Sequence, residues 1–223
     1  MNFLDNLDWS VIPSNADLLW SGVQLTVVLT FVTMILSIIF GTVLAVLRVC
    51  GYRVLSWPSA FVVNFFRSVP LLLLLFWVFY VLPATTDIRL SPFLAALVGL
   101  SACGSAYVAE VIRAGILSIR KGQREAALAL GMTRSKAFLR ITMPQAVRRV
   151  IPPLATIWVS LFKDTSLVST IGVADLSHAA LSVRAQTFRV FEILTALAVI
   201  YLLLAYPQAK LTDWLHRRLR VEE

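Results

Sequence analysis

The sequence at residues 23–47 is VQLTVVLTFVTMILSIIFGTVLAVL, and it contains no charged side chain. A helix rises about 1.5 Å per residue, so about 20 apolar residues cross the roughly 30 Å of hydrocarbon in a bilayer. Apolar runs recur along the whole chain, in which 59% of the residues are hydrophobic and only 14% are charged. A soluble domain with one core does not have this composition. The sequence therefore predicts an all-α membrane protein.

Apolar runs between charged residues predict about five membrane spans, which form a single transmembrane domain over residues 1–223. The spans are expected at about 22–47, 58–82, 92–112, 150–176 and 188–206. Ser91 and Pro92 suit the N-cap and first turn of the third span. The second span contains Arg67 and begins either at Val69 or near Pro58. We favour the full-length span from Pro58, because the shorter one would require a thinned bilayer.

The distribution of charge predicts how the chain is oriented. Lys and Arg concentrate after the first, third and fifth spans, up to Arg220, whereas residues 1–21 carry Asp5, Asp8 and Asp17 without a basic residue. The positive-inside rule then places the N-terminus in the periplasm and the C-terminus in the cytoplasm. An acidic start is the reverse of a signal peptide, so the first span is expected to be retained. Membrane lipids, and not nucleic acid, are the expected counter-charge for the net charge of +8.

Residues 113–149 form a long cytoplasmic loop between the third and fourth predicted spans. The loop is too long for a simple connection and too short for a domain with its own core. Strong helix formers at 125–130 precede Gly131 and predict a short helix with a defined stop. Thr133 is expected to cap a second helix, and Pro144 to redirect the chain toward the membrane. From spacing alone, an amphipathic loop lying on the lipid headgroups is an equal alternative.

Residues within this loop resemble a known family. The pattern Glu125-Ala126-Ala127, then Gly131, then 141–144 (ITMP) resembles the EAA loop of binding-protein-dependent ABC import permeases, with methionine at 143 where that family usually has leucine. The resemblance implies that the short helix docks into a groove of a cytoplasmic ATPase and transmits its closure to the spans. The residues that this role would involve are Glu125, Ala126, Ala127, Gly131, Ile141 and Pro144.

Further segments resemble the polar amino-acid branch of the same family, which imports histidine, arginine, glutamine or glutamate. They are NFFRSVPLL at 64–72, AEVIRAGI at 109–116, GQREAA at 122–127, PQA at 144–146 and KDTSL at 163–167. The resemblance implies a multi-pass protein of the bacterial inner membrane, paired with a second copy or a sister permease. It also implies a cytoplasmic ABC ATPase dimer and a periplasmic or lipid-anchored substrate-binding protein. The chain has no GxxxxGK[ST] motif, so ATP and magnesium would be bound by the ATPase and no cofactor is expected here.

Two groups of charged residues inside predicted spans are candidate functional sites. Lys163 and Asp164 fall within the depth of the membrane, where an unpaired charge costs about 2.5 to 3.5 kcal/mol and usually pairs or faces a wet cavity. We therefore place Lys163, Asp164, Thr165 and Ser166 on a substrate path, with a self-contained Lys163–Asp164 ion pair or an outer loop as the alternatives. Arg67 and Glu110 are expected to form a structural ion pair near the cytoplasmic end.

Three other classes of membrane protein are less consistent with the sequence. An ion-gradient-driven secondary amino acid transporter would have inverted repeats, which are not visible. A channel would need a filter-like segment, which is also missing. An intramembrane enzyme would need a motif such as HExxH or facing carboxylates, and neither occurs, so no catalytic residue is expected. Cys50 and Cys103 lack metal-ligand spacing, so no metal site is expected either.

Overall fold

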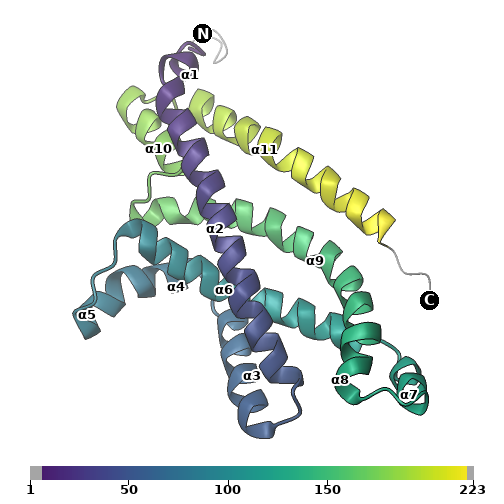
Figure 1. Ribbon diagram of the computed structural model, residues 1–223. Coiled ribbons are helices and arrows are strands. Elements are labelled where there is room, and N and C mark those ends of the chain that lie inside the picture. The colour runs from purple at the N-terminus through teal and green to yellow at the C-terminus, as the bar shows by residue number, and fades with distance from the viewer. Residues whose placement is uncertain (1–6, 220–223) are drawn as a thin grey trace. The chain divides into compact units, whose positions relative to one another are not determined.

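The computed structural model describes residues 7–219 and is helical throughout, with no strand in that range (Figure 1). This confirms the predicted all-α class. Asp5 and Arg220, which contributed to the predicted orientation, lie outside the described residues. The α-helices are α1 (Val11–Ser14), α2 (Ala16–Val49), α3 (Arg53–Ser68), α4 (Leu71–Phe76), α5 (Leu82–Thr86), α6 (Pro92–Leu117), α7 (Lys121–Ala129), α8 (Arg134–Ala137), α9 (Met143–Asp164), α10 (Leu176–Thr187) and α11 (Val190–Arg218).

Three helices, α2, α6 and α11, are long and apolar enough to cross a membrane, and two broken pairs of helices raise the number of possible spans to five. The three correspond to the first, third and fifth predicted spans. The Ser91 hydroxyl accepts the Leu94 N–H at 3.3 Å, as expected for the cap of α6. Helix α11 continues to Arg218, beyond the predicted end near 206, because hydropathy marks the membrane and not the end of the helix.

The second predicted span, 58–82, is not a single helix. Helix α3 ends at Ser68, and α4 begins at Leu71 after Pro70. Val69 is extended, with φ −85° and ψ 131°, because the ring of a following proline disfavours the helical conformation. After α4 the chain widens into a π-helical turn, Trp77–Val81, before α5.

The helix of the fourth predicted span begins earlier than expected, and it is not α-helical along its whole length. Helix α8, a π-helical turn (Phe138–Thr142), α9 and a 3₁₀ helix (Thr165–Ile171) follow one another without an intervening loop. The expectation that Pro144 redirects the chain is wrong, because Pro144 lies in the first turn of α9. The wider π-helical turn before it accommodates a residue that has no N–H and whose ring clashes with a regular helix.

The chain divides into two compact units. The first comprises residues up to 34 together with 70–100 and 159–208, and its core joins apolar residues of α1, α2, α10 and α11 around Leu176 and Ile193. The second comprises 35–69, 101–158 and the residues from 209 onward, and its core joins α2, α3 and α6 around Ala45, Val63 and Ala106.

In the first unit, the backbone at the start of α10 lies directly against α2. A Cβ atom added at Gly22 would lie 2.8 Å from the Leu176 Cα, closer than real Cβ contacts. The buried Thr26 hydroxyl, one helical turn further on, accepts the Leu176 N–H at 3.1 Å. Because Gly22 has no side chain, the start of α10 comes close enough to α2 for the Thr26 hydroxyl to accept the buried Leu176 N–H.

Gly22→Ala is expected to destabilise the chain by about 1 to 3 kcal/mol, because the contacted atoms belong to backbone and must shift. Thermal unfolding in detergent measures the effect. Gly122→Ala is the matched control, because nothing lies within 4 Å of a Cβ at this helical position. There alanine should stabilise by about 0.5 to 1 kcal/mol. Equal unfolding temperatures for the two variants would contradict the close contact at Gly22.

Candidate functional site

The loop between α6 and α9 contains a short helix with a fully formed C-terminal stop. After α7, the Gly131 N–H donates to the Leu128 carbonyl at 3.0 Å and the Met132 N–H donates to the Ala127 carbonyl at 3.1 Å. This is the Schellman arrangement, and it needs the left-handed backbone that Gly131 supplies with φ +80°. The predicted helix and its stop are confirmed, although the helix begins at Lys121 and not at Glu125.

The predicted cap of the second short helix is also present. The Thr133 hydroxyl accepts the Lys136 N–H at 3.3 Å at the start of α8. Ala137, at the end of α8, is fully buried. The second helix therefore begins as expected and then continues through the π-helical turn into α9.

Side-chain hydrogen bonds tie this loop to the helices that flank it. The Gln145 amide, in α9, donates to the Ile141 carbonyl at 2.9 Å and also to the side-chain oxygen of Gln123 in α7. Arg149, one turn further along α9, donates to the Ser118 carbonyl at 2.7 Å at the end of α6. Hydrogen bonds therefore join α7 to α9, and α9 to the residue that follows α6.

The six candidate coupling residues all lie in this segment, but not all on its surface. Ala127 is buried and Ile141 is half-buried, so both pack within the segment. The other four candidates are exposed, namely Glu125, Ala126, Gly131 and Pro144. Leu130, at the end of α7, is apolar but 82% exposed, so it adds apolar surface to the segment.

A cluster of four charged side chains lies where α2, α3 and α6 meet in the second unit. Glu110 pairs with Arg67 at 3.6 Å, so the structure brings together the two residues expected to form an ion pair. The same carboxylate also contacts the guanidinium groups of Arg48 and Arg113. Arg113 was detectable from sequence as a neighbour three positions along the helix, whereas Arg48 comes from a distant segment with no local signal.

The candidate substrate-path residues lie at the junction of α9 and the 3₁₀ helix. Lys163 is exposed, Asp164 and Ser166 are half-buried, and no ion pair within 4 Å involves Lys163 or Asp164 in the part of the chain that the structure describes. Thr165 is fully buried, and its hydroxyl donates to the Phe162 carbonyl at 2.7 Å. The Thr165 hydroxyl is therefore satisfied within the helix and does not line a surface here.

Asp175 is a buried carboxylate that the sequence analysis missed. Its side chain caps α10 by accepting the N–H groups of Ser177 at 3.2 Å and His178 at 3.0 Å. The Tyr201 hydroxyl of α11 lies 3.5 Å away and 3.0 Å from the Ser177 hydroxyl. An aspartate just before a helix is a recognisable capping signal, but its fully buried position is not visible in the sequence.

The described residues offer no cluster suited to metal binding. Among residues 7–219, no group of three or more His, Cys, Asp or Glu side chains could hold a metal ion, and neither Cys50 nor Cys103 forms a disulfide there.

Comparison with known proteins places these features in a family context. The family model described as "Binding-protein-dependent transport system inner membrane component" matches residues 37–221. The chain is 35% identical over 221 residues to the glutamate/aspartate import permease protein GltK of Escherichia coli O6:H1, covering 95% of this chain and 97% of the relative. It is 36% identical over 210 residues to the probable glutamine ABC transporter permease protein GlnM of Bacillus subtilis, covering 94% and 97%.

A solved structure is similar over nearly the whole chain. It is described as the crystal structure of an amino acid ABC transporter with histidines. The two chains superpose with a TM-score of 0.91 at 30% sequence identity, which covers 96% of this chain and 99% of the other. The chain therefore has a fold for which a solved example exists.

Proposed function

The chain belongs to the family of inner-membrane components of binding-protein-dependent transport systems, and on that premise we propose that it imports polar amino acids. It is a multi-pass protein of the inner membrane and a permease subunit of the ABC importer class. Members of this family work with an ATPase and a substrate-binding protein. The whole-chain similarity to amino acid permeases is the observation that carries the proposal, and it favours an ABC importer over an ion-driven transporter.

The proposed substrate class is broader than any one amino acid. Relatives of nearly equal identity carry names that refer to glutamate and aspartate in one case and to glutamine in another. A sequence about equally distant from both supports the class of polar amino acids and not one member of it. The substrate-binding protein would then supply much of the selectivity.

In this proposal α7 docks on a cytoplasmic ABC ATPase. Glu125, Ala126 and Gly131 are exposed on the segment, and the exposed Leu130 offers apolar surface to a protein partner. The bonds from Gln145 to Gln123 and from Arg149 to Ser118 would carry movement of α7 into the spans. ATP and magnesium would be held by the ATPase, and this chain would supply no cofactor site.

We place Lys163, Asp164 and Ser166 on the substrate path and leave out the buried Thr165. A charge at membrane depth is costly unless it pairs or meets water. Lys163 and Asp164 lie next to each other without an ion pair within 4 Å in the described residues. They could thus meet the carboxylate and ammonium of a passing amino acid in turn.

The proposed orientation places the N-terminus in the periplasm, where the substrate-binding protein would deliver its load, and α7 and the C-terminus in the cytoplasm. Basic residues of α7 and α8, and those at the end of α11, support this arrangement. A second copy or a sister permease would complete the path.

The test is uptake of labelled amino acids into proteoliposomes that contain this chain, its ATPase and the binding protein. We expect uptake that requires both ATP and the binding protein, with a preference for polar amino acids. Asp164→Asn should lower uptake about tenfold or more, because a hydrogen bond to a charged group contributes about 1.5 to 3 kcal/mol. Asp213→Asn removes the same charge from an exposed position of α11 and should leave uptake unchanged.

Two outcomes would contradict the proposal. Uptake that persists without ATP and without the binding protein would indicate an ion-driven transporter. Equal losses in Asp164→Asn and Asp213→Asn would show that Asp164 acts only through the overall charge of the chain, and would remove it from the substrate path.

A further inference from the structure

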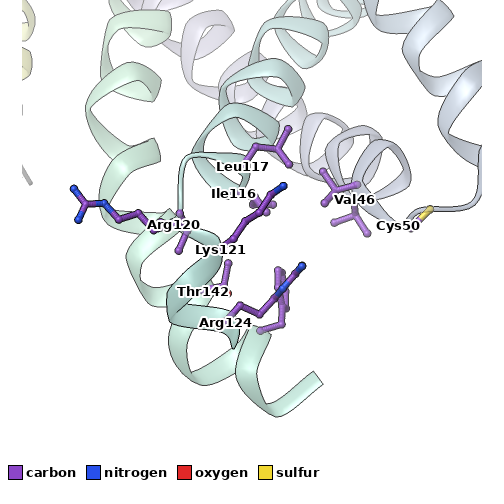
Figure 2. Close-up of a pocket in the computed structure, with 11 residues that line it drawn as sticks. Val46, Cys50, Ile116, Leu117, Arg120, Lys121, Arg124 and Thr142 are labelled. Atoms are coloured by element: carbon purple, nitrogen blue, oxygen red, sulfur yellow. The ribbon is translucent and has the colours of Figure 1, made fainter. Parts of the chain in front are cut away.

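A cavity of about 390 Å³ lies in the second unit, where the ends of α2 and α6 meet α7 (Figure 2). Its wall is mainly apolar and is formed by Val46 and Val49 of α2 and Ile116 and Leu117 of α6. These residues belong to the last turns of two membrane-spanning helices. The cavity is therefore at the boundary between the bilayer hydrocarbon and the lipid headgroups. Water in it would contact mostly apolar side chains.

The same cavity is bordered by positive charge. Arg120, Lys121 and Arg124 line it, at and just inside the N-terminus of α7. Figure 2 shows the Lys121 and Arg124 side chains extending on the side of Val46 and Cys50, whereas Arg120 extends the other way. Within residues 7–219, no carboxylate lies within 4 Å of any of these three cations.

We propose that this cavity binds one anionic phospholipid, with its phosphate at Lys121 and Arg124 and an acyl chain along Val46, Val49 and Leu117. The two halves of the cavity call for the two halves of such a molecule. A soluble anion would neutralise the cations but leave the apolar wall in contact with water. A zwitterionic lipid would cover the wall but bring no net charge to the cations. The first free N–H groups of α7 add to the attraction for the phosphate.

A lipid bound here would contact a span and the helix α7 at the same time. Val46 and Leu117 lie in α2 and α6, while Lys121 and Arg124 lie in α7. The headgroup would thus fix the start of α7 relative to the membrane surface. This binding site depends on the membrane location of the chain and not on the identity of the transported substrate.

The test is native mass spectrometry of the importer complex in nonionic detergent, titrated with phosphatidylglycerol or phosphatidylcholine, with inorganic phosphate as competitor. We expect one phosphatidylglycerol per permease chain, weaker phosphatidylcholine binding, and no displacement by phosphate. The Lys121→Gln/Arg124→Gln variant should bind phosphatidylglycerol about 30-fold more weakly, at about fivefold for each charge near the membrane surface. Arg134→Gln/Lys136→Gln removes equal charge from exposed positions of α8 outside the cavity and should bind normally.

A third variant tests the apolar half without changing the charge. Val46→Trp fills part of the cavity and should also weaken phosphatidylglycerol binding. This result tests the proposal even if the Lys121→Gln/Arg124→Gln variant does not fold. Displacement by phosphate would show a soluble-anion site, and equal losses in the α7 and α8 variants would show diffuse attraction to the headgroups. Unchanged lipid binding in the α7 variant, together with lost ATPase binding, would show that these cations contact the partner protein. Each of these three results would overturn the proposal.

Discussion

The Glu110→Gln variant is expected to unfold about 6 to 12 °C below the unmodified chain, which corresponds to a loss of about 3 kcal/mol in a chain of this size. Glutamine keeps the length of the side chain but removes the negative charge that Arg48, Arg67 and Arg113 share. Three guanidinium groups would then face one another without a counter-charge. The loss arises from this repulsion and not from lost packing.

The size of the effect follows from burial. The side chains of Arg48 and Glu110 are only 12% and 23% exposed, so water screens this contact poorly. Breaking a buried pair by removing one partner costs about 3 to 5 kcal/mol, and the remaining exposure of the cluster places the expected loss at the lower end. Thermal unfolding in detergent at low and high salt measures it, and high salt should reduce the difference only in part.

Arg67→Gln is the control within the same cluster. Arg67 is the most exposed of the three arginines, and its guanidinium lies 3.6 Å from the carboxylate and 5.7 Å from the centre of the Tyr107 ring. Its removal also relieves repulsion from Arg48 and Arg113, so the expected loss is about 1 kcal/mol or less. If Glu110→Gln unfolded within about 2 °C of Arg67→Gln, the carboxylate would not be the centre of the cluster.

The long apolar helices could be predicted from sequence because their signal is local. An uncharged run such as 23–47 specifies a membrane span through its own composition, whatever surrounds it. The stop at Gly131 and the caps at Ser91 and Thr133 were equally local, because one residue type suits one backbone conformation or one bond.

The errors arose where two local rules competed. The residue before Pro70 is disfavoured in a helix, but the length needed to cross a bilayer favoured one span over 58–82, and the structure shows the break. At Pro144 the opposite happened, because the π-helical turn before it accommodates a proline that the sequence suggested would end the helix. Amino-acid composition predicts neither the break before Pro70 nor the helix that includes Pro144.

Apart from the pairing of Arg67 with Glu110, contacts between distant segments could not be predicted. The pairing of Arg48 with Glu110 and the burial of Asp175 beside Tyr201 depend on which helices pack together. In each case the sequence shows the charge but not its partner. The residue pattern of 125–144 indicates the function. The hydrogen bonds of Gln145 to Gln123 and of Arg149 to Ser118 are visible only in the structure.

Gly131→Val is expected to lower ATP-driven uptake about five- to thirty-fold if α7 couples the ATPase to the spans. Gly131 has φ +80°, a conformation that costs a residue with a Cβ about 1 to 2 kcal/mol, and nothing lies within 4 Å of the added Cβ. The substitution therefore acts only on the backbone. It opposes the Schellman stop of α7 and lowers the population of the docked geometry by the factor that this energy implies.

Gly51→Val separates coupling from general strain. Gly51, between α2 and α3, has φ +81° and also has open space around its Cβ position, so valine imposes the same backbone cost outside the loop. We expect the two variants to unfold at similar temperatures, while only Gly131→Val loses uptake and stimulation of ATP hydrolysis by the substrate-loaded binding protein. Equal uptake in the two variants would mean that the ATPase docks elsewhere, because the backbone strain is matched and only the position on the molecule differs.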